Sequence, residues 1–281
     1  MRYGLFLPAM AEFADPHRVA DLAGKAEDTG WDGFFLWDHI VAGPERPVAD
    51  TWVTLTAAAG ATRTIRLGSM VTPLARRRPW VLARQLATLD HFCRGRLVAG
   101  IGLGDDGWQE FSSFAETVDP VERGELLDES LEVLQQCLSG EPVEYHGERL
   151  DVTSVAFLPR PVQDPIPIWA ACRWPHRRPL ARAARLQGIF PIFPFDGAPA
   201  APDPREVATI RGALDQLGVP GPESYDLVLR YAVSLAPPGT TAATATALEV
   251  AGATWILEGF GPGEPPANVV EEIVAAGPPG S

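Results

Sequence analysis

Lysine is almost absent from this chain of 281 residues: Lys25 is the only one, although 23 residues are lysine or arginine. This scarcity limits the chemistry, because a Schiff-base enzyme carries a lysine in its site and a GxxxxGK[ST] phosphate loop contains one. Lys25 falls in a predicted outer helix. Both kinds of site are therefore excluded.

Cysteine and long apolar runs are also scarce. The three cysteines, Cys93, Cys137 and Cys172, are far apart and never in a CxxC spacing, which favours a reducing compartment over a disulfide framework. The N-terminus, MRYGLFLPAM, lacks the features of a signal peptide, and no apolar run reaches the roughly 18 residues of a membrane span. We therefore expect a soluble, cytoplasmic protein.

Positive charge is in deficit, with a net charge of -13. The only basic runs are residues 76–78 and 177–178, whereas contact with nucleic acid or an anionic membrane needs a broad basic face. We expect a small-molecule substrate as the partner and neither nucleic acid nor membrane.

Short apolar runs alternate with amphipathic stretches along the whole chain. Several of the apolar runs are continuous, which is typical of parallel strands covered on both faces. Strands are predicted at residues 3–8, 33–37, 65–71, 96–102, 166–171, 188–192, 226–235 and 254–257. Helices are predicted near residues 16–29, from 50, and near 79–91, 121–138, 176–186, 203–217, 241–251 and 267–276.

Eight such units predict an α/β fold, a single (β/α)₈ barrel, with an open doubly wound sheet as the leading competitor. One barrel typically takes about 250 residues, so residues 1–281 are expected to form one domain. Residues 141–165 are rich in proline and are predicted to be a loop or small excursion, and 277–281 a loose tail.

The active site of such a barrel lies at the carboxyl ends of its strands. Asp38 and His39 follow the second strand and are the best candidates for proton transfer, because histidine titrates near neutrality and a carboxylate can orient it. Alternatively, Asp38 only caps the next segment and His39 is a wall residue.

Two further strand ends could bind a ligand. Gly102, Gly104 and Gly107 match GxGxxG formally, but in the fourth unit and with two aspartates, so close approach to a planar ring or simple turn geometry fits better. Arg173 follows the fifth strand and could anchor a phosphate, or could belong to a solvated basic cluster with Arg177 and Arg178. Four tryptophans near strand ends could line a slot for a flat ligand or simply fill the barrel: Trp37, Trp108, Trp169 and Trp174.

Other chemistries lack support. The five histidines show no metal-ligand spacing, so no metal site is predicted, and no GxSxG nucleophile motif exists.

The chain resembles the luciferase-like flavin-dependent oxidoreductases, which include the deazaflavin (coenzyme F420) dehydrogenases and reductases. The resemblance runs from end to end through GLFLP at 4–8, GWDGFFLWDH at 30–39, TRTIRLGSMVTPLARRRP at 62–79, LARQLATLDHFCRGRLVAGIGLG at 82–104, LLDESLEVLQQCLSGEPVEYHG at 126–147, FLPRPVQDPIPIWAACRWP at 157–175 and GATWILEGFGP at 252–262.

The resemblance implies a ring bound in the barrel mouth against strand three, with a non-prolyl cis peptide between Met70 and Val71. It further implies catalytic roles for Asp38 and His39 near the reactive carbon and for Asp105 in proton transfer. The implied cofactor contacts are Met70, Val71, Ala170, Ala171, Cys172 and Arg173, and the turn after strand four adds Gly102 and Gly104 as predicted contacts.

The implied activity is hydride transfer to or from a small organic substrate, or its monooxygenation. The cofactor stays open: coenzyme F420 would mean a dehydrogenase or reductase, whereas FMN would permit monooxygenation, with NAD(P)H as a possible co-substrate. A homodimer is also implied.

Several residues depart from the family pattern, among them Cys172 and Gln187. They support an alternative reading, a barrel without redox chemistry that acts as a binding or accessory subunit. A nicotinamide dehydrogenase with an open sheet is the most distant alternative.

Overall fold

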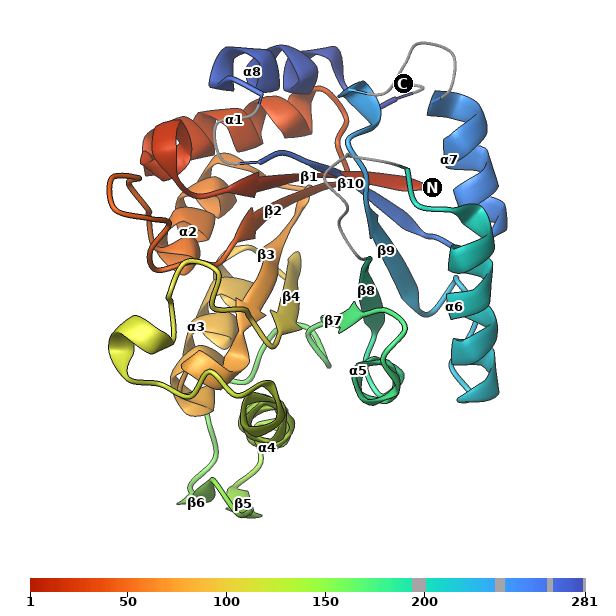
Figure 1. The fold of residues 1–281 in the computed structure, drawn as a ribbon. Helices are drawn as coiled ribbons and strands as arrows, with labels where there is room; N and C mark the ends of the chain where they lie inside the picture. Colours follow the sequence, from red (N-terminus) through yellow and green to blue (C-terminus); the bar gives the residue numbers. More distant parts are fainter. Residues whose placement is uncertain (194–200, 236–240, 262–264, 280–281) are drawn as a thin grey trace.

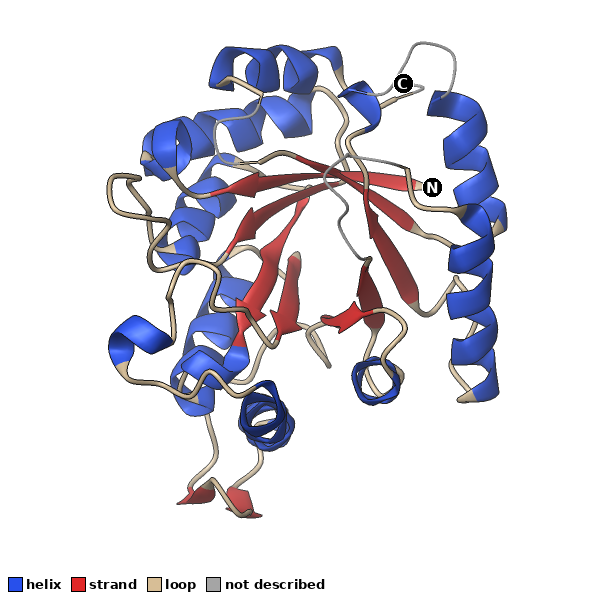
Figure 2. Cartoon of the chain, viewed as in Figure 1, coloured by secondary structure: helices blue, strands red, loops and turns tan. Residues whose placement is uncertain are grey.

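The computed structural model describes residues 1–193, 201–235, 241–261 and 265–279. Eight parallel strands close into a barrel in the order β1-β10-β9-β8-β7-β4-β3-β2, and helices surround it (Figures 1 and 2). The predicted barrel is therefore confirmed, and the open sheet is excluded. The barrel strands are β1 (Arg2–Pro8), β2 (Gly33–Trp37), β3 (Arg66–Pro73), β4 (Leu97–Gly102), β7 (Ile168–Arg173), β8 (Gly188–Ile192), β9 (Asp226–Arg230) and β10 (Trp255–Gly259).

The helices begin at recurrent capping signals. Asp15, Asp50, Asp119 and Asp203 each accept a hydrogen bond from a backbone N–H of the first turn, and three of them precede a proline. The helices are α1 (Pro16–Asp28), α2 (Thr51–Ala61), α3 (Pro79–Phe92), α4 (Pro120–Ser139), α5 (Arg177–Ala183), α6 (Pro204–Gln216), α7 (Thr241–Val250) and α8 (Ala267–Ala276).

The barrel has two separate hydrophobic cores. An inner core of large side chains fills the barrel itself, as is usual for this fold, with members Phe6, Phe35, Met70, Val98, Trp169, Phe190, Val228, Trp255 and Leu257. The outer core lies between strands and helices and takes the alternate strand residues, such as Ile168, Ala170 and Cys172 on β7. On each strand, the residues beyond the inner core that continue the same inward-facing alternation therefore point into the mouth of the barrel.

Two segments differ from the prediction in the kind of structure that they form. The predicted strand 226–235 ends at Arg230, and Val233–Leu235 forms a 3₁₀ turn. Buried Glu258, on the outer side of β10, accepts the backbone N–H of Ser234 at 3.1 Å, which draws the chain out of the sheet. Within residues 141–165, β5 (Val143–His146) and β6 (Asp151–Ser154) form an antiparallel hairpin that extends beyond α4 in Figure 1.

The expected loose tail, residues 277–281, falls partly outside the described residues. Among the helices that are described, none is both long and apolar enough to cross a bilayer.

Candidate active site

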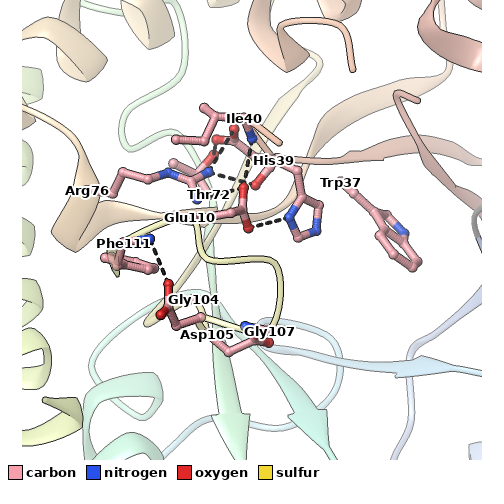
Figure 3. Close-up of polar contacts among 12 residues, drawn as sticks. Trp37, His39, Ile40, Thr72, Arg76, Gly104, Asp105, Gly107, Glu110 and Phe111 are labelled. Carbon is pink, nitrogen blue, oxygen red and sulfur yellow. Dashed lines mark hydrogen bonds and ion pairs between the residues drawn. The ribbon is translucent and has the colours of Figure 1, made fainter. Parts of the chain in front are cut away.

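His39 and Glu110 form a close pair at the mouth of the barrel (Figure 3). His39 follows β2, Glu110 lies in the loop after β4, and His39 Nδ1 is 2.6 Å from Glu110 Oε2. The other carboxylate oxygen, Oε1, accepts the backbone N–H of Ile40 at 2.7 Å. Arg76 Nη1 also lies 3.1 Å from Oε1 as an ion pair, although its N–H is not aligned for a hydrogen bond.

The surroundings of Glu110 keep it ionised. Burial alone would raise its pKa, but the hydrogen bond and charge of His39, the Ile40 N–H and the charge of Arg76 outweigh burial and lower the pKa. A carboxylate can only accept hydrogen bonds, so His39 Nδ1 must be the donor. Nε2 is then the ring nitrogen available for proton exchange with a ligand.

Asp38 is buried and fully engaged. Arg77 Nη2 contacts Asp38 Oδ1 at 2.6 Å and Oδ2 at 2.8 Å, and Thr72 donates its hydroxyl to Oδ2 at 2.7 Å. Arg76 donates to the backbone carbonyl of Asp38 at 3.0 Å. This arrangement fixes the strand-two end against the segment after β3 and leaves the Asp38 carboxylate little access to a ligand. Its catalytic role stays a prediction, and the geometry supports a positioning one.

Asp105 is exposed at the turn after β4. Its Oδ1 accepts the backbone N–H of Gly107 at 2.8 Å, which closes the turn. Gly104 has φ +71°, and a Cβ there would meet the Cβ of Pro73 at 2.9 Å, so turn geometry accounts for this glycine. No described hydrogen bond or ion pair joins Asp105 to His39. The acidic partner of His39 is Glu110 instead.

Small side chains form the wall of the mouth over β3, β4 and β7. The Met70–Val71 peptide is cis, and the pairing of β3 with β4 shifts register there, between Ser69 and Thr72. Met70 packs into the inner core. Val71, Gly102 and Ala171 meet above it: a Cβ on Gly102 would lie 2.6 Å from Val71 Cγ2 and 3.2 Å from the Cβ of Ala171.

The β7 residues proposed for cofactor contact divide between two sides. Ala171 lies against the inner core, and Arg173, next on that side, is exposed at the mouth. Ala170 and Cys172 pack into the outer core, so their side chains do not face the mouth. Burial raises the pKa of Cys172 to about 11, which leaves its thiol unreactive near neutral pH.

The tryptophans also divide. The His39 ring lies 5.8 Å from the Trp37 ring and 4.6 Å from the Trp108 ring, centroid to centroid, so both belong to the site. Trp37 Nε1 is buried without a described hydrogen-bond partner. Trp169 is part of the inner core, and Trp174 packs on the outer core.

Sequence analysis did not assign Glu110, Arg76, Arg77 or Arg230 to the site. Arg76 and Arg77 were visible as a short basic run, but a basic run does not reveal that two buried carboxylates face it. Glu110 lies in an irregular loop where no periodicity places it. Arg230 is the last residue of β9, and its guanidinium carbon lies 5.3 Å from the centre of the Trp37 ring.

A groove of about 550 Å³ lies away from these side chains, on the outside of the barrel between α2 and α3. It is lined mainly by apolar residues, including Trp52, Val81 and Phe92. No histidine or carboxylate of the described residues lines this groove.

Known proteins resemble this chain in sequence. An F420-dependent glucose-6-phosphate dehydrogenase from Nakamurella multipartita is 33% identical over 178 residues, which cover 62% of this chain and 51% of that protein. Its counterpart from Kineococcus radiotolerans is 34% identical over 173 residues, covering 59% and 50%. The chain thus spans about half the length of these curated relatives.

Solved structures resemble it in fold. The coenzyme F420 dependent tetrahydromethanopterin reductase from Methanopyrus kandleri superposes with a TM-score of 0.75 at 20% identity, covering 98% of this chain and 96% of that one. A monooxygenase from Streptomyces bottropensis gives a TM-score of 0.69 at 23% identity, covering 90% and 80%.

These likenesses agree with the predicted resemblance. The family model for luciferase-like monooxygenases matches residues 1–255, which is most of the chain. The protein therefore belongs to the luciferase-like monooxygenase family.

Proposed function

We propose that this protein is an oxidoreductase that uses a deazaflavin, coenzyme F420, to move a hydride to or from a small organic substrate at the mouth of the barrel. The observation that carries the proposal is the His39–Glu110 pair, 2.6 Å apart, beside a wall of small side chains. A proton-transfer pair and room for a flat ring are what such chemistry asks of the protein.

We place the three-ring heterocycle of the cofactor against one wall of the mouth. Val71, Gly102 and Ala171 would support its face, because these three small residues meet at one place above the inner core. The buried, unpaired Nε1 of Trp37 could donate to a polar atom of a ligand. Arg173 is exposed at the mouth and would bind the phosphate of the cofactor tail. Gly104, Ala170 and Cys172 would contribute only through the backbone.

When bound, the deazaflavin supplies two-electron hydride chemistry. His39 Nε2 takes up the proton that leaves the substrate during oxidation, or returns it during reduction. Glu110 keeps the ring oriented through Nδ1 and stabilises the positive charge when Nε2 is protonated. Asp38, held by Arg77 and Thr72, positions the segment that carries His39.

Two observations bear on the choice of cofactor. The relatives from Nakamurella multipartita and Kineococcus radiotolerans are named as F420-dependent, which supports the deazaflavin. FMN with NAD(P)H as co-substrate is the second candidate, favoured by the structural likeness to a monooxygenase. A non-redox accessory role would require that neither ring system binds.

Direct binding measurements test the proposal. Purified protein is titrated separately with F420 and FMN while tryptophan fluorescence is followed, since Trp37 and Trp108 flank His39. Saturable quenching by F420, weakened in an Arg173→Met variant, supports the proposal. If only FMN binds, the cofactor is FMN and not F420. If neither F420 nor FMN binds at high micromolar concentration, the proposed redox function is wrong.

We also propose that two copies associate through the outer face of α2 and α3. Val53 and Val81 are exposed there, at 65% and 51%, and the groove between the helices is lined by no acidic residue. Copies with a net charge of -13 repel each other, so a face without carboxylates is where they can approach. Light scattering should give a dimer for the protein and a monomer for Val81→Asp. A Val250→Asp control, on α7, should remain dimeric.

The compartment and the partners are proposals as well. All three cysteines are buried and free, which supports a reducing, cytoplasmic location. We propose small molecules as the partners, with no role in nucleic-acid or membrane binding.

A further inference from the structure

Arg230 is built into the wall of the barrel mouth. It follows Val228 on the inner side of β9, and its guanidinium carbon lies 5.7 Å from the centre of the Phe6 ring and 5.3 Å from that of Trp37. Gly259 makes room for it, because a Cβ there would lie 2.7 Å from both Cγ and Nε of Arg230. The side chain is therefore packed on three sides in a defined position.

The positive charge of Arg230 has no described counter-charge. Arg76 and Arg77 at the same mouth face Asp38 and Glu110, whereas no carboxylate of the described residues pairs with Arg230. Burial lowers the pKa of Arg230, although solvent still reaches the side chain. Arg230 thus presents a charge in a defined position that is open to solvent and has no described counter-charge, which is what capture of an anion from solution requires.

The amount of positive charge limits the kind of anion. Arg230 is the only lysine, arginine or histidine in residues 212–281. The three internal stretches outside the described residues, 194–200, 236–240 and 262–264, contain none either, and their only charged residues are Asp196 and Glu264. One guanidinium fork matches one carboxylate in charge and geometry, whereas a phosphate ester dianion would keep an uncompensated charge.

The position of Arg230 relates this anion to the proposed chemistry. The guanidinium of Arg230 and the imidazole of His39 both lie near the ring of Trp37, 5.3 Å and 5.8 Å from its centre. We propose that Arg230 binds the carboxylate of the substrate, so that the substrate is an organic monocarboxylate whose reacting carbon lies beside His39. This inference rests on the proposed function and adds the class of substrate to it.

The test uses small anions as probes on the wild-type protein, with and without F420. Propionate and inorganic phosphate at pH 8 are titrated at constant ionic strength, and tryptophan fluorescence reports binding because Arg230 lies over Trp37. The variants are Arg230→Met, Arg230→Lys, Arg173→Met and Arg205→Met. Arg205, exposed on α6, is the control for the change in net charge.

Propionate should bind the wild-type protein more tightly than phosphate does. Arg230→Met should weaken propionate binding by about 10-fold or more, and Arg230→Lys by less, because lysine keeps the charge and loses the fork. Arg205→Met should leave propionate binding unchanged, and so should Arg173→Met in the absence of F420. All variants should keep the wild-type melting temperature within a few degrees. If Arg230→Met does not fold, Arg230→Lys still tests the role of Arg230.

Three outcomes would overturn the inference. The first is that propionate fails to bind, or binds Arg230→Met as well as wild type. The second is that phosphate binds more tightly and is lost equally in Arg173→Met, which would mean that two arginines hold one dianion. The third is that Arg230→Met abolishes F420 binding, which would make Arg230 a cofactor ligand. If no cofactor binds to wild type, the proposed function fails, while the propionate result still decides the role of Arg230.

Discussion

His39 Nδ1 and Glu110 Oε2 lie 2.6 Å apart although 71 residues separate them in the chain. The contact joins the end of β2 to the loop after β4 across the mouth of the barrel, and Arg76 completes it from the segment after β3. One imidazole is thereby oriented by groups from three consecutive strand ends. The first prediction concerns this pair.

Replacing Glu110 by glutamine should lower turnover by about 100-fold or more, because His39 loses the carboxylate that fixes its tautomer and stabilises its charge. Glu110 has a lowered pKa and is ionised above the acid range, so the loss should not be recovered by raising the pH. Steady-state assays of wild type, Glu110→Gln and Glu116→Gln check this. Glu116 is exposed in the same loop, and its variant should keep full activity. Equal turnover for Glu110→Gln and Glu116→Gln would contradict the role of the pair.

Removing the guanidinium of Arg77 should destabilise the fold by about 3 kcal/mol, because the buried carboxylate of Asp38 loses its bidentate partner. Urea denaturation of Arg77→Met measures the change in the free energy of unfolding. Arg78→Met is the matched control, since Arg78 is exposed and lies over the Trp80 ring. The two variants should differ clearly, and similar stabilities would show that Asp38 does not depend on Arg77.

A methyl group on Gly102 should weaken cofactor binding by about 10-fold or more, because the added Cβ would lie 2.6 Å from Val71 and displace the supporting wall. The dissociation constant of Gly102→Ala for F420 is compared with that of Gly124→Ala. Gly124 lies in α4 with nothing within 4 Å of an added Cβ, so its alanine variant should bind normally and gain up to about 1 kcal/mol of stability. If Gly102→Ala binds F420 with unchanged affinity and keeps its circular dichroism spectrum, the cofactor ring does not lie against this wall.

Glu258 should make the stability fall as pH rises. Burial raises its pKa to about 7 against a reference value of 4.5, so the folded state holds a proton that the unfolded chain releases. Below pH 4.5 Glu258 is protonated in both states, so ionising the buried carboxyl costs the folded state nothing. Between pH 4.5 and 7 the folded state loses stability, by at most about 3 kcal/mol.

Glu258→Gln should remove that loss, since its amide oxygen can still accept the Ser234 N–H. Urea denaturation at pH 5 and pH 8 would measure it, with Glu223→Gln as the exposed control. A wild-type stability that is flat over this range, or a Gln variant that follows the wild-type slope, would disagree with a protonated Glu258.

The barrel could be predicted from the sequence because strand and helix patterns are local. Asp50 before a helix and the continuous apolar run of β4 each indicate their element without knowledge of distant residues. The end of β9 could not be placed, because it depends on Glu258, a residue 24 positions beyond Ser234. Site residues divide in the same way: His39 stands at a strand end where the fold exposes it, whereas Glu110 is brought to it only by the path of a loop.

The ion pairs of Asp38 and Glu110 also separate the mouth into two unequal halves. The half formed by β2, β3 and β4 is cross-linked, so changes there disturb several strand ends at once. The half formed by β8, β9 and β10 contributes a lone cation, and no cross-strand ion pair of that kind is described there. Descendants of this chain could therefore acquire new substrates by substitutions on one side while the proton-transfer machinery on the other is inherited intact.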